Sequence, residues 1–243
     1  MDRALTYEKW DEETVKLLVE GFSDTMEVLK WSYREYGENI VYACSFGAEG
    51  IVLLDLISKI NKKARIAFLD TGLHFDETYE VIEAVKKRYP EFKIEMIKPF
   101  VTLEQQEKEY GKELWKHNPN LCCQLRKVEP LARELSKVQA WISGLRREQS
   151  ITRKDVQYLN KDEKFKNIKI CPLIHWKWDE IWTYINLNDL DYNILHDQNY
   201  PSIGCKPCTL PVEENSDLRA GRWAQMAKTE CGLHQTSQEH GYR

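Results

Sequence analysis

Four cysteines form two pairs that could bind a metal centre. Cys122 and Cys123 are adjacent, and Cys205 and Cys208 are separated by two residues. A Cys-x-x-Cys turn directs both thiolates at one centre. Adjacent side chains on a helix point about 100° apart, because the helix has 3.6 residues per turn. That spread suits an iron–sulfur cluster better than a single tetrahedral zinc. The alternative is two core cysteines and a separate redox pair.

Cys231 lies in a polar C-terminal segment, where its thiol could act as a nucleophile. The thiolate is the reactive form, and a free cysteine with a pKa of about 8.5 is mostly protonated at neutral pH. Lys228, His234 or a nearby arginine would lower that pKa, whereas Glu230 works in the opposite direction. From spacing alone, an inert thiol is the better interpretation of Cys231.

Arginines occur in two short stretches and indicate a pocket for a small anion. Guanidinium groups bind sulfate and phosphate oxygens through paired hydrogen bonds. The formal net charge of −4 argues against a nucleic-acid partner, which would need a basic surface. A net charge of this size is compatible with a local basic pocket. The alternative is a set of solvated surface arginines. The residues concerned are Arg146, Arg147, Arg153, Arg219 and Arg222.

The first half of the chain alternates between strand and helix patterns. Short apolar runs at residues 39–44, 65–69 and 92–97 predict strands, with helices at 51–60 and 76–88 between them. This alternation indicates an α/β fold with a doubly wound, mainly parallel sheet. Further strands are predicted at 140–143 and 166–171. Further helices are predicted at 13–36, 103–115, 122–136 and 176–185, and Pro130 is expected to bend the third or end it early.

Two loops follow predicted strands, at the edge where open α/β sheets bind their ligands. Residues 45–50 read Ser-Phe-Gly-Ala-Glu-Gly and precede a helix. Small residues let the backbone approach an anion, and a helix N-terminus offers free N–H groups to it. The residues expected to contact a nucleotide are Ser45, Phe46 and Gly47 in the first loop and Asp70, Thr71 and Gly72 in the second.

Length and composition favour one globular domain. The 243 residues are 42% hydrophobic and 30% charged. No apolar run reaches the roughly 20 residues of a membrane helix, and the N-terminus has no signal-peptide pattern. We therefore expect a cytoplasmic protein with no membrane partner. Residues 1–228 are expected to form the nucleotide- and cluster-binding domain, and residues 229–243 a mobile tail.

Several motifs resemble one enzyme family. Glu-Cys-Gly-Leu-His at 230–234 is similar to the catalytic signature of the adenylyl sulfate and phosphoadenylyl sulfate reductases. The segments 144–150 and 219–223 resemble the family's arginine motifs. Residues 69–72 are similar to its version of the second loop. Residues 122–131 and 204–209 resemble the two halves of the cluster site in its iron–sulfur, thioredoxin-dependent subgroup.

This resemblance implies a fold and a chemistry. The fold would be of the adenine-nucleotide alpha-hydrolase-like type, although residues 45–50 lack the Gly-Gly pair and the Asp of its ATP-cleaving members. Cys231 would attack the sulfur of the activated sulfate, and reduced thioredoxin would release sulfite from the resulting S-sulfocysteine. The two cysteine pairs would hold one 4Fe-4S cluster per chain. Lys127 would link that cluster to the substrate electrostatically, and His234 would belong to the catalytic segment.

The resemblance also implies a homo-oligomer. Four arginines, Arg146, Arg147, Arg219 and Arg222, would bind the sulfate and phosphate groups. The choice between adenylyl sulfate (APS) and its 3′-phosphorylated form (PAPS) stays open.

Two alternative functions come from other classes of protein. A tRNA-modifying nucleotide-loop enzyme would need ATP-cleaving residues and a more basic surface. A zinc-stabilised binding module would not need the motif around Cys231.

Overall fold

A six-stranded sheet forms the centre of the chain in the computed structural model, which describes residues 4–213, 216–224, 226, 228 and 230–233. The strand order is β3-β2-β1-β4-β6-β5. All neighbouring strands are parallel except β5 and β6. The predicted doubly wound sheet is therefore confirmed. The strands are β1 (Ile40–Ala43), β2 (Arg65–Leu69), β3 (Lys93–Ile97), β4 (Ala140–Ile142), β5 (Leu159–Asp162) and β6 (Asn167–Ile170).

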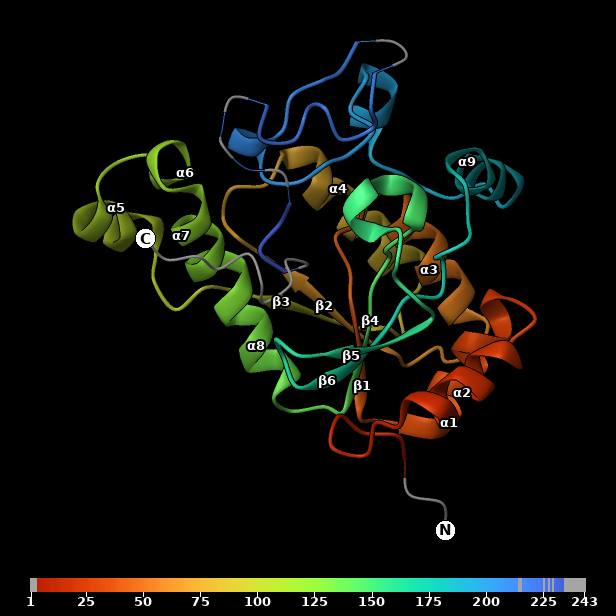
Figure 1. Cartoon of the computed structure of the whole chain (residues 1–243). Coiled ribbons are helices and arrows are strands. Elements are labelled where there is room, and N and C mark those ends of the chain that lie inside the picture. Colours follow the sequence, from red (N-terminus) through yellow and green to blue (C-terminus); the bar gives the residue numbers. More distant parts are fainter. Residues whose placement is uncertain (1–3, 214–215, 225, 227, 229, 234–243) are drawn as a thin grey trace.

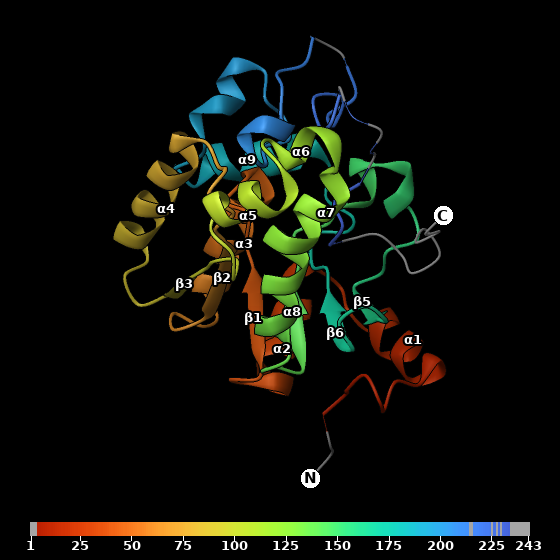
Figure 2. The same ribbon diagram turned by 90° about the vertical axis from the view of Figure 1, so that its left-hand side faces the viewer.

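Helices cover both faces of this sheet (Figure 1). Figure 2 looks onto the face covered by α5 (Leu103–Tyr110), α6 (Leu114–His117), α7 (Pro119–Cys123) and α8 (Glu129–Leu135). The opposite face carries α1 (Glu12–Glu20), α2 (Thr25–Tyr36), α3 (Ala48–Ser58), α4 (Asp76–Arg88) and α9 (Trp178–Leu187). Among the described residues, none of the helices is both long and apolar enough to cross a membrane.

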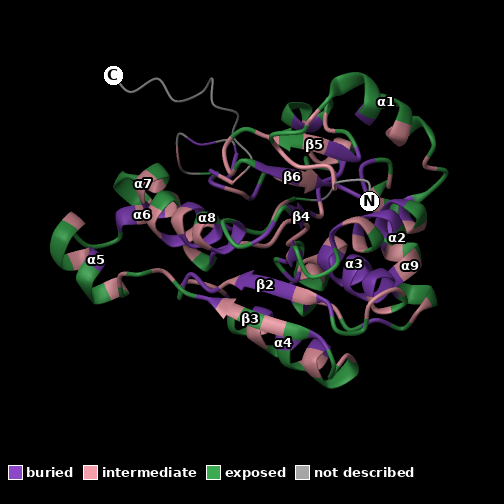
Figure 3. Cartoon of the chain, turned by 90° about the horizontal axis from the view of Figure 1, so that it is seen from below, coloured by how far each residue is buried: buried purple, intermediate pink, exposed green. Residues whose placement is uncertain are grey.

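The alternation of side chains along β1 divides the core between these two faces. Ile40 and Tyr42 belong to the larger hydrophobic cluster, together with α2, α3, α4 and α9. Val41 points the other way and packs with Leu131 and Leu135 of α8. Successive residues of a strand point to opposite faces, so a strand covered by helices on both sides is apolar throughout. Figure 3 shows the resulting band of buried residues through the sheet and α3.

Four local features differ from the expectations. The predicted helix at 103–115 is two helices, because Gly111, with a φ of 85°, ends α5 and α6 begins at Leu114. The predicted helix at 13–36 is two helices, because Gly21 ends α1 and Asp24 caps α2 by accepting a hydrogen bond from the Glu27 backbone N–H. The polar strand β5 was not predicted. It pairs with the sheet on one side only, so its sequence lacks an apolar run.

The predicted helix at 122–136 begins earlier, at Pro119, and is not uniform. A π-helical turn, η1 (Gln124–Val128), separates α7 from α8. Pro130 lies in the first turn of α8, where its missing N–H and fixed φ are tolerated. Single π-helical turns often mark functional sites. This one carries Lys127 and directly follows the adjacent cysteines.

Candidate active site

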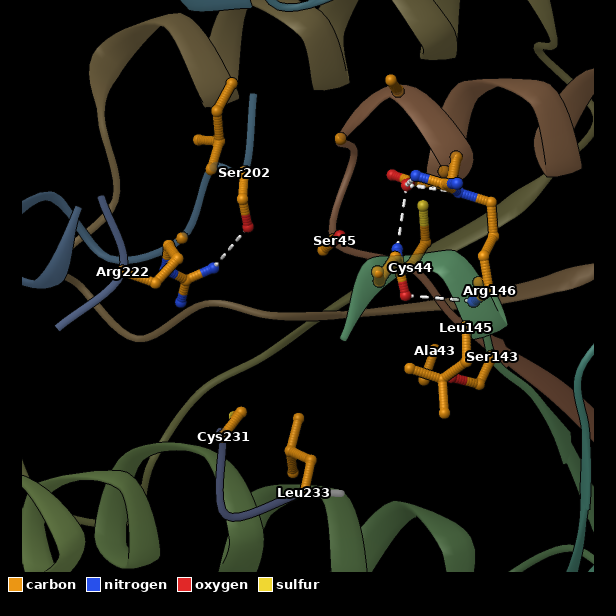
Figure 4. A pocket seen from close by; sticks show the side chains of 18 of the residues that line it. Ala43, Cys44, Ser45, Ser143, Leu145, Arg146, Ser202, Arg222, Cys231 and Leu233 are labelled. Carbon is orange, nitrogen blue, oxygen red and sulfur yellow. Dashed lines mark hydrogen bonds and ion pairs between the residues drawn. The ribbon is translucent and has the colours of Figure 1, made fainter. Parts of the chain in front are cut away.

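A pocket opens where the sheet order changes direction. From the central strand β1 the chain extends to β2 and β3 on one side, and β4 flanks β1 on the other. Loops that leave such a switch point diverge and form a ligand crevice. The loops after β1 and β4 line this pocket (Figure 4). Lys127 of η1 and parts of the C-terminal region complete its wall. The candidate residues from the sequence that line it are Ser45, Gly47, Lys127, Arg146, Arg153, Arg219, Arg222 and Cys231.

The loop after β1 presents two of its three predicted residues to the pocket. Ser45 and Gly47 line it, and Gly47 caps the N-terminus of α3. Phe46 has a φ of 55° and is buried, with its ring 5.5 Å from that of Phe68. A positive φ is unfavourable for a bulky residue, and the packing of the ring in the core offsets that cost. Phe46 thus fixes the loop from behind and does not face the ligand space.

The second predicted loop lies outside the pocket, against the cysteines. The Asp70 carboxylate accepts hydrogen bonds from the Tyr79 hydroxyl at 2.7 Å and from the Gly72 N–H at 3.1 Å. The Thr71 hydroxyl lies 3.3 Å from the Cys205 sulfur. The backbone N–H of Lys206 bonds to the carbonyl of Leu73, in the same loop. The loop therefore supports the segment that carries Cys205.

The two cysteine pairs meet although they are far apart in sequence. Cys122 and Cys123 end α7. Cys205 precedes the 3₁₀ turn η5 (Lys206–Cys208), and Cys208 ends it. The two segments are connected through Thr71, whose carbonyl accepts from Arg126 Nε at 2.6 Å and whose hydroxyl lies 3.3 Å from the Cys205 sulfur. Burial and the neighbouring Cys205 and Cys208 raise the pKa of Cys122 to about 11. Such mutual influence places these three thiols in one neighbourhood.

The thiols are not held in a finished ligand geometry. Among the described residues, no group of three or more His, Cys, Asp or Glu side chains is placed to hold a metal ion. Cys123 is engaged elsewhere, because its thiol is hydrogen-bonded to Cys231. The donor type and the neighbourhood suit an iron–sulfur cluster. The arrangement of the sulfurs would have to adjust around it.

Cys231 is buried at the pocket wall, and Figure 4 shows it with Leu233 across from Ser45, Ser202 and Arg222. The hydrogen bond from Cys123 is the main reason that the pKa of Cys231 lies well below its usual value. Burial opposes this effect, and the ammonium of Lys127 adds to it. The arrangement favours a thiolate, the nucleophilic form. His234, the other predicted residue of this segment, lies outside the described residues.

The arginines predicted after β4 point in different directions. Arg146 is fully buried and lines the pocket, but its charge is already paired. It contacts Glu49 Oε1 through Nη2 at 2.8 Å and Glu148 Oε2 through Nη1 at 2.6 Å. Arg147 points away from the pocket, because Nε donates to the Val156 carbonyl at 2.8 Å and Nη2 to the Gln157 side chain. Arg146 therefore shapes the site, and Arg147 belongs to the surface beside it.

The C-terminal arginines face the pocket. Residues 208–210 pair with 221–223 through backbone hydrogen bonds, which places Arg222 beside the Cys205 turn. Its Nη1 donates to the Ser202 hydroxyl at 3.3 Å, and its buried Nε has no partner among the described residues. A half-buried guanidinium whose Nε is buried without a partner is suited to an anionic ligand. Arg219 lines the same pocket, where burial and the charge of Arg153 lower its pKa to about 10.

One carboxylate is bound by two of these arginines. Arg153 contacts Glu230 twice, from Nε to Oε2 at 3.0 Å and from Nη2 to Oε1 at 2.9 Å. Arg219 Nη2 donates to the same Oε1 at 2.8 Å. Burial alone would raise the pKa of Glu230, but the two guanidinium charges outweigh it and leave that pKa below its usual value. In the sequence, only the motif around Cys231 indicated Glu230, and nothing indicated that Glu230 would pair with Arg153.

Comparison with known proteins places this site in a family. Residues 39–211 match the family described as the phosphoadenosine phosphosulfate reductase domain. The chain belongs to this family. It is 65% identical to adenosine 5′-phosphosulfate reductase 2 of Bacillus subtilis (strain 168), over 97% of this chain and all of that protein. It is 58% identical to adenosine 5′-phosphosulfate reductase of Geobacillus kaustophilus (strain HTA426), over 95% of this chain and 99% of the relative.

The solved structures agree with this assignment. A crystal structure of phosphoadenylyl-sulfate (PAPS) reductase from Candida auris, in a phosphate complex, has a TM-score of 0.73 and 31% identity. It covers 85% of this chain and 100% of that one. FMN adenylyltransferase of Candida glabrata is 15% identical with a TM-score of 0.57, and shows the α/β fold alone. The predicted reductase family and fold class are thus confirmed. Of the residues that line the reductase pocket, Ser202 had no signal in the sequence, and Glu49 was indicated only by its place in the loop at 45–50.

Proposed function

We propose that this member of the reductase family reduces adenylyl sulfate to sulfite and AMP, with thioredoxin as electron donor, in assimilatory sulfate reduction. One observation carries the proposal: the Cys231 thiol lines the same pocket as Lys127, Arg219, Arg222 and the N-terminal loop of α3. A nucleophile, an anion-binding cluster and a helix N-terminus suited to phosphate are thus combined at a switch point. That combination suits an adenosine phosphosulfate.

The reaction proceeds in two transfers. The Cys231 thiolate attacks the sulfur of the substrate, an S–S bond forms, the S–O bond breaks, and AMP leaves with the electron pair of that bond. Positive groups such as Arg222 stabilise the charge on the departing phosphate. A thioredoxin thiolate then attacks Cys231 Sγ and expels sulfite. The second thioredoxin thiol closes its disulfide and frees Cys231, so thioredoxin supplies both electrons.

Four cysteines, Cys122, Cys123, Cys205 and Cys208, would hold a 4Fe-4S cluster, one per chain. Support comes from the buried thiol neighbourhood and from the π-helical turn that places Lys127 between the cysteines and the pocket. When bound, the cluster would supply an electrostatic environment for the site. Burial lowers the pKa of Lys127, and the surrounding thiols, Cys205 foremost, outweigh burial and keep Lys127 charged. Lys127 can therefore hold the anionic groups of the substrate.

APS is the proposed substrate because the similar relatives at 56% to 65% identity are named adenosine 5′-phosphosulfate reductases. PAPS is the second candidate, favoured by the Candida auris relative, which is named for it. Homo-oligomerisation, a cytoplasmic location and a mobile tail over residues 229–243 remain predictions. Size-exclusion chromatography with light scattering tests the first of them.

The deciding experiment uses APS labelled with radioactive sulfur. Incubation with the pure protein, without thioredoxin, should label Cys231, and the label should leave as sulfite when reduced thioredoxin is added. Cys231→Ser is the matched control and should remain unlabelled. Intact wild-type protein that takes no label from APS or PAPS would contradict the proposal. Comparing the labelling rates of the two substrates decides between them.

A further inference from the structure

The acid beside the nucleophile needs an explanation. Glu230 directly precedes Cys231, and an unpaired carboxylate there would disfavour the thiolate. In the structure its side chain is 5% exposed and is bound by Arg153 and Arg219, at 6% and 13% exposure. Its Oε1 also accepts the N–H of Cys231 at 2.8 Å. The two positive charges exceed the one negative charge, so the group does not repel a thiolate.

The carboxylate therefore joins Cys231 to fixed parts of the fold. Arg153 lies in the 3₁₀ turn η3 (Ile151–Arg153), and Arg219 lies in the turn before the segment that pairs with 208–210. Arg153 also bonds to the side-chain oxygen of Gln149. Gln149 in turn donates to Glu49 Oε1 at 2.8 Å, in the first turn of α3. A hydrogen-bonded chain thus runs from the backbone of Cys231 to the nucleotide loop.

A second contact holds the other side of the nucleophile. The Lys164 ammonium, in the turn between β5 and β6, donates to the carbonyl of Gly232. Phe165 of the same turn and Leu233 pack on the smaller core cluster. Cys231 is therefore held from both directions. The two contacts differ in kind, because the first depends on a buried charge that is bound in bidentate fashion.

From these contacts we propose that Glu230 is a positioning residue, whose ion pairs with Arg153 and Arg219 hold Cys231 against the substrate. We call these ion pairs the clasp. They must break before thioredoxin can reach the S-sulfocysteine. This inference rests on the proposed function. Because Cys231 is buried in the clasped state, that state serves the first transfer and obstructs the second. The two transfers therefore respond differently when the clasp is weakened.

The test measures the two transfers separately in the full-length protein. Glu230→Gln keeps the size of the side chain and removes its charge. We expect labelling of Cys231 by radioactive APS, without thioredoxin, to slow at least ten-fold. Release of labelled sulfite from the isolated intermediate by reduced thioredoxin should be as fast as in wild type, or faster. Arg153→Lys keeps the charge and loses the paired geometry. As with Glu230→Gln, it should slow the labelling and leave the release of sulfite as fast as in wild type, or faster.

Glu163→Gln is the matched control, because this exposed carboxylate contacts Tyr7 and Lys166 and does not touch the clasp. It should leave both rates within two-fold of wild type. If Glu230→Gln and Arg153→Lys slow the two transfers equally and lower the melting temperature, Glu230 is only structural and the inference fails. Unchanged labelling in both variants also overturns it. If wild type itself takes no label, the proposed function fails instead.

Discussion

At the residue scale, the structure separates arginines that look alike in the sequence. Arg146 is paired with two carboxylates, and Arg147 donates to a backbone carbonyl outside the pocket. Arg222 faces the pocket, and its Nε has no partner in the described part of the chain. Paired guanidinium groups have little capacity left for a ligand, whereas a half-satisfied one gains from binding an anion. The arginines therefore contribute unequally to substrate affinity.

Arg222→Ala should weaken substrate binding at least ten-fold, as expected for the loss of about 1.5–3 kcal/mol from a charge-assisted hydrogen bond. Arg147→Ala should change the affinity less than two-fold, because its guanidinium points away from the pocket. The KM for APS, or the Kd for AMP by calorimetry, measures both variants. Equal losses in the two variants would show that the arginines are not distinguished in this way.

Gly204→Ala should reproduce part of the Arg222 defect. A Cβ at Gly204 would overlap the guanidinium of Arg222, whose flexible end would have to move. The fold should persist, since only a side-chain terminus is displaced, while the Kd for AMP rises several-fold. Gly21→Ala, in the turn after α1, is the control. A Kd equal to that of wild type would indicate that Arg222 need not occupy its observed position.

At the scale of elements, a buried polar cluster connects helices that are distant in sequence. Asp55 of α3 accepts from Tyr184 of α9 at 2.7 Å, from Tyr89 after α4 at 2.8 Å, and from Lys59 at 2.8 Å. Burial by itself would raise the pKa of Asp55, but these three donors outweigh it and leave the pKa below its usual value. This cluster anchors the C-terminal end of α3, whose N-terminal end follows the nucleotide loop.

Asp55→Asn should therefore lower the free energy of unfolding by about 1.5–3 kcal/mol at pH 7, the range for hydrogen bonds to a charged group. A lowered pKa stabilises the fold fully above the unfolded value of about 3.9, and that stabilisation disappears as the pH falls through the folded value. The difference from wild type should thus shrink in acid, measured by urea unfolding from pH 7 to pH 3. Asp155→Asn, at an exposed position, is the control. A pH-independent difference would contradict the ionic role of Asp55.

At the scale of the whole molecule, three segments far apart in sequence meet beside the pocket. The loop at 70–73, the helical segment α7–η1 and the turn at 204–208 are joined by Arg126, Thr71 and Cys205. Bound metal would stabilise this junction in the native state alone, because the unfolded chain does not bring the cysteines together. The C-terminal segment pairs with the same turn and depends on it.

Removal of iron by a chelator should lower the melting temperature by several degrees and bleach the visible absorbance. Hydrogen exchange should rise at 119–128 and 199–213 and not in β1 or α3. Cys231→Ser is the control, because Cys231 is outside the proposed ligand set and its protein should retain iron and show the same shift. A colourless protein with metal-independent melting would overturn the proposed cluster.

Local patterns in the sequence sufficed for much of this protein. The strands β1 and β2 and their helices were predictable from apolar runs, because a parallel strand covered on both faces is mainly apolar. The edge strand β3 alternates apolar and charged residues, which is the other pattern typical of a strand. The cysteine pairs and the segment around Cys231 indicated the chemistry, because each motif consists of particular residue types only a few positions apart in the sequence. By contrast, β5 and the π-helical turn were not predicted. The edge strand β5 has no apolar run, and the π-helical turn directly precedes α8, whose Pro130 lacks the N–H that would continue a regular helical ladder.

Only the tertiary structure decided which predicted residues meet. It brought Lys127, Arg222 and Cys231 into one pocket, turned Arg147 away, and placed Asp70, Thr71 and Gly72 beside the cysteines rather than in the pocket. The physical reason is that a side chain's direction follows from the strand crossovers and from partners distant in sequence. Glu230 shows this most clearly: its sequence position makes it an unfavourable neighbour of a thiolate, and two arginines brought there by folding turn it into a clasp.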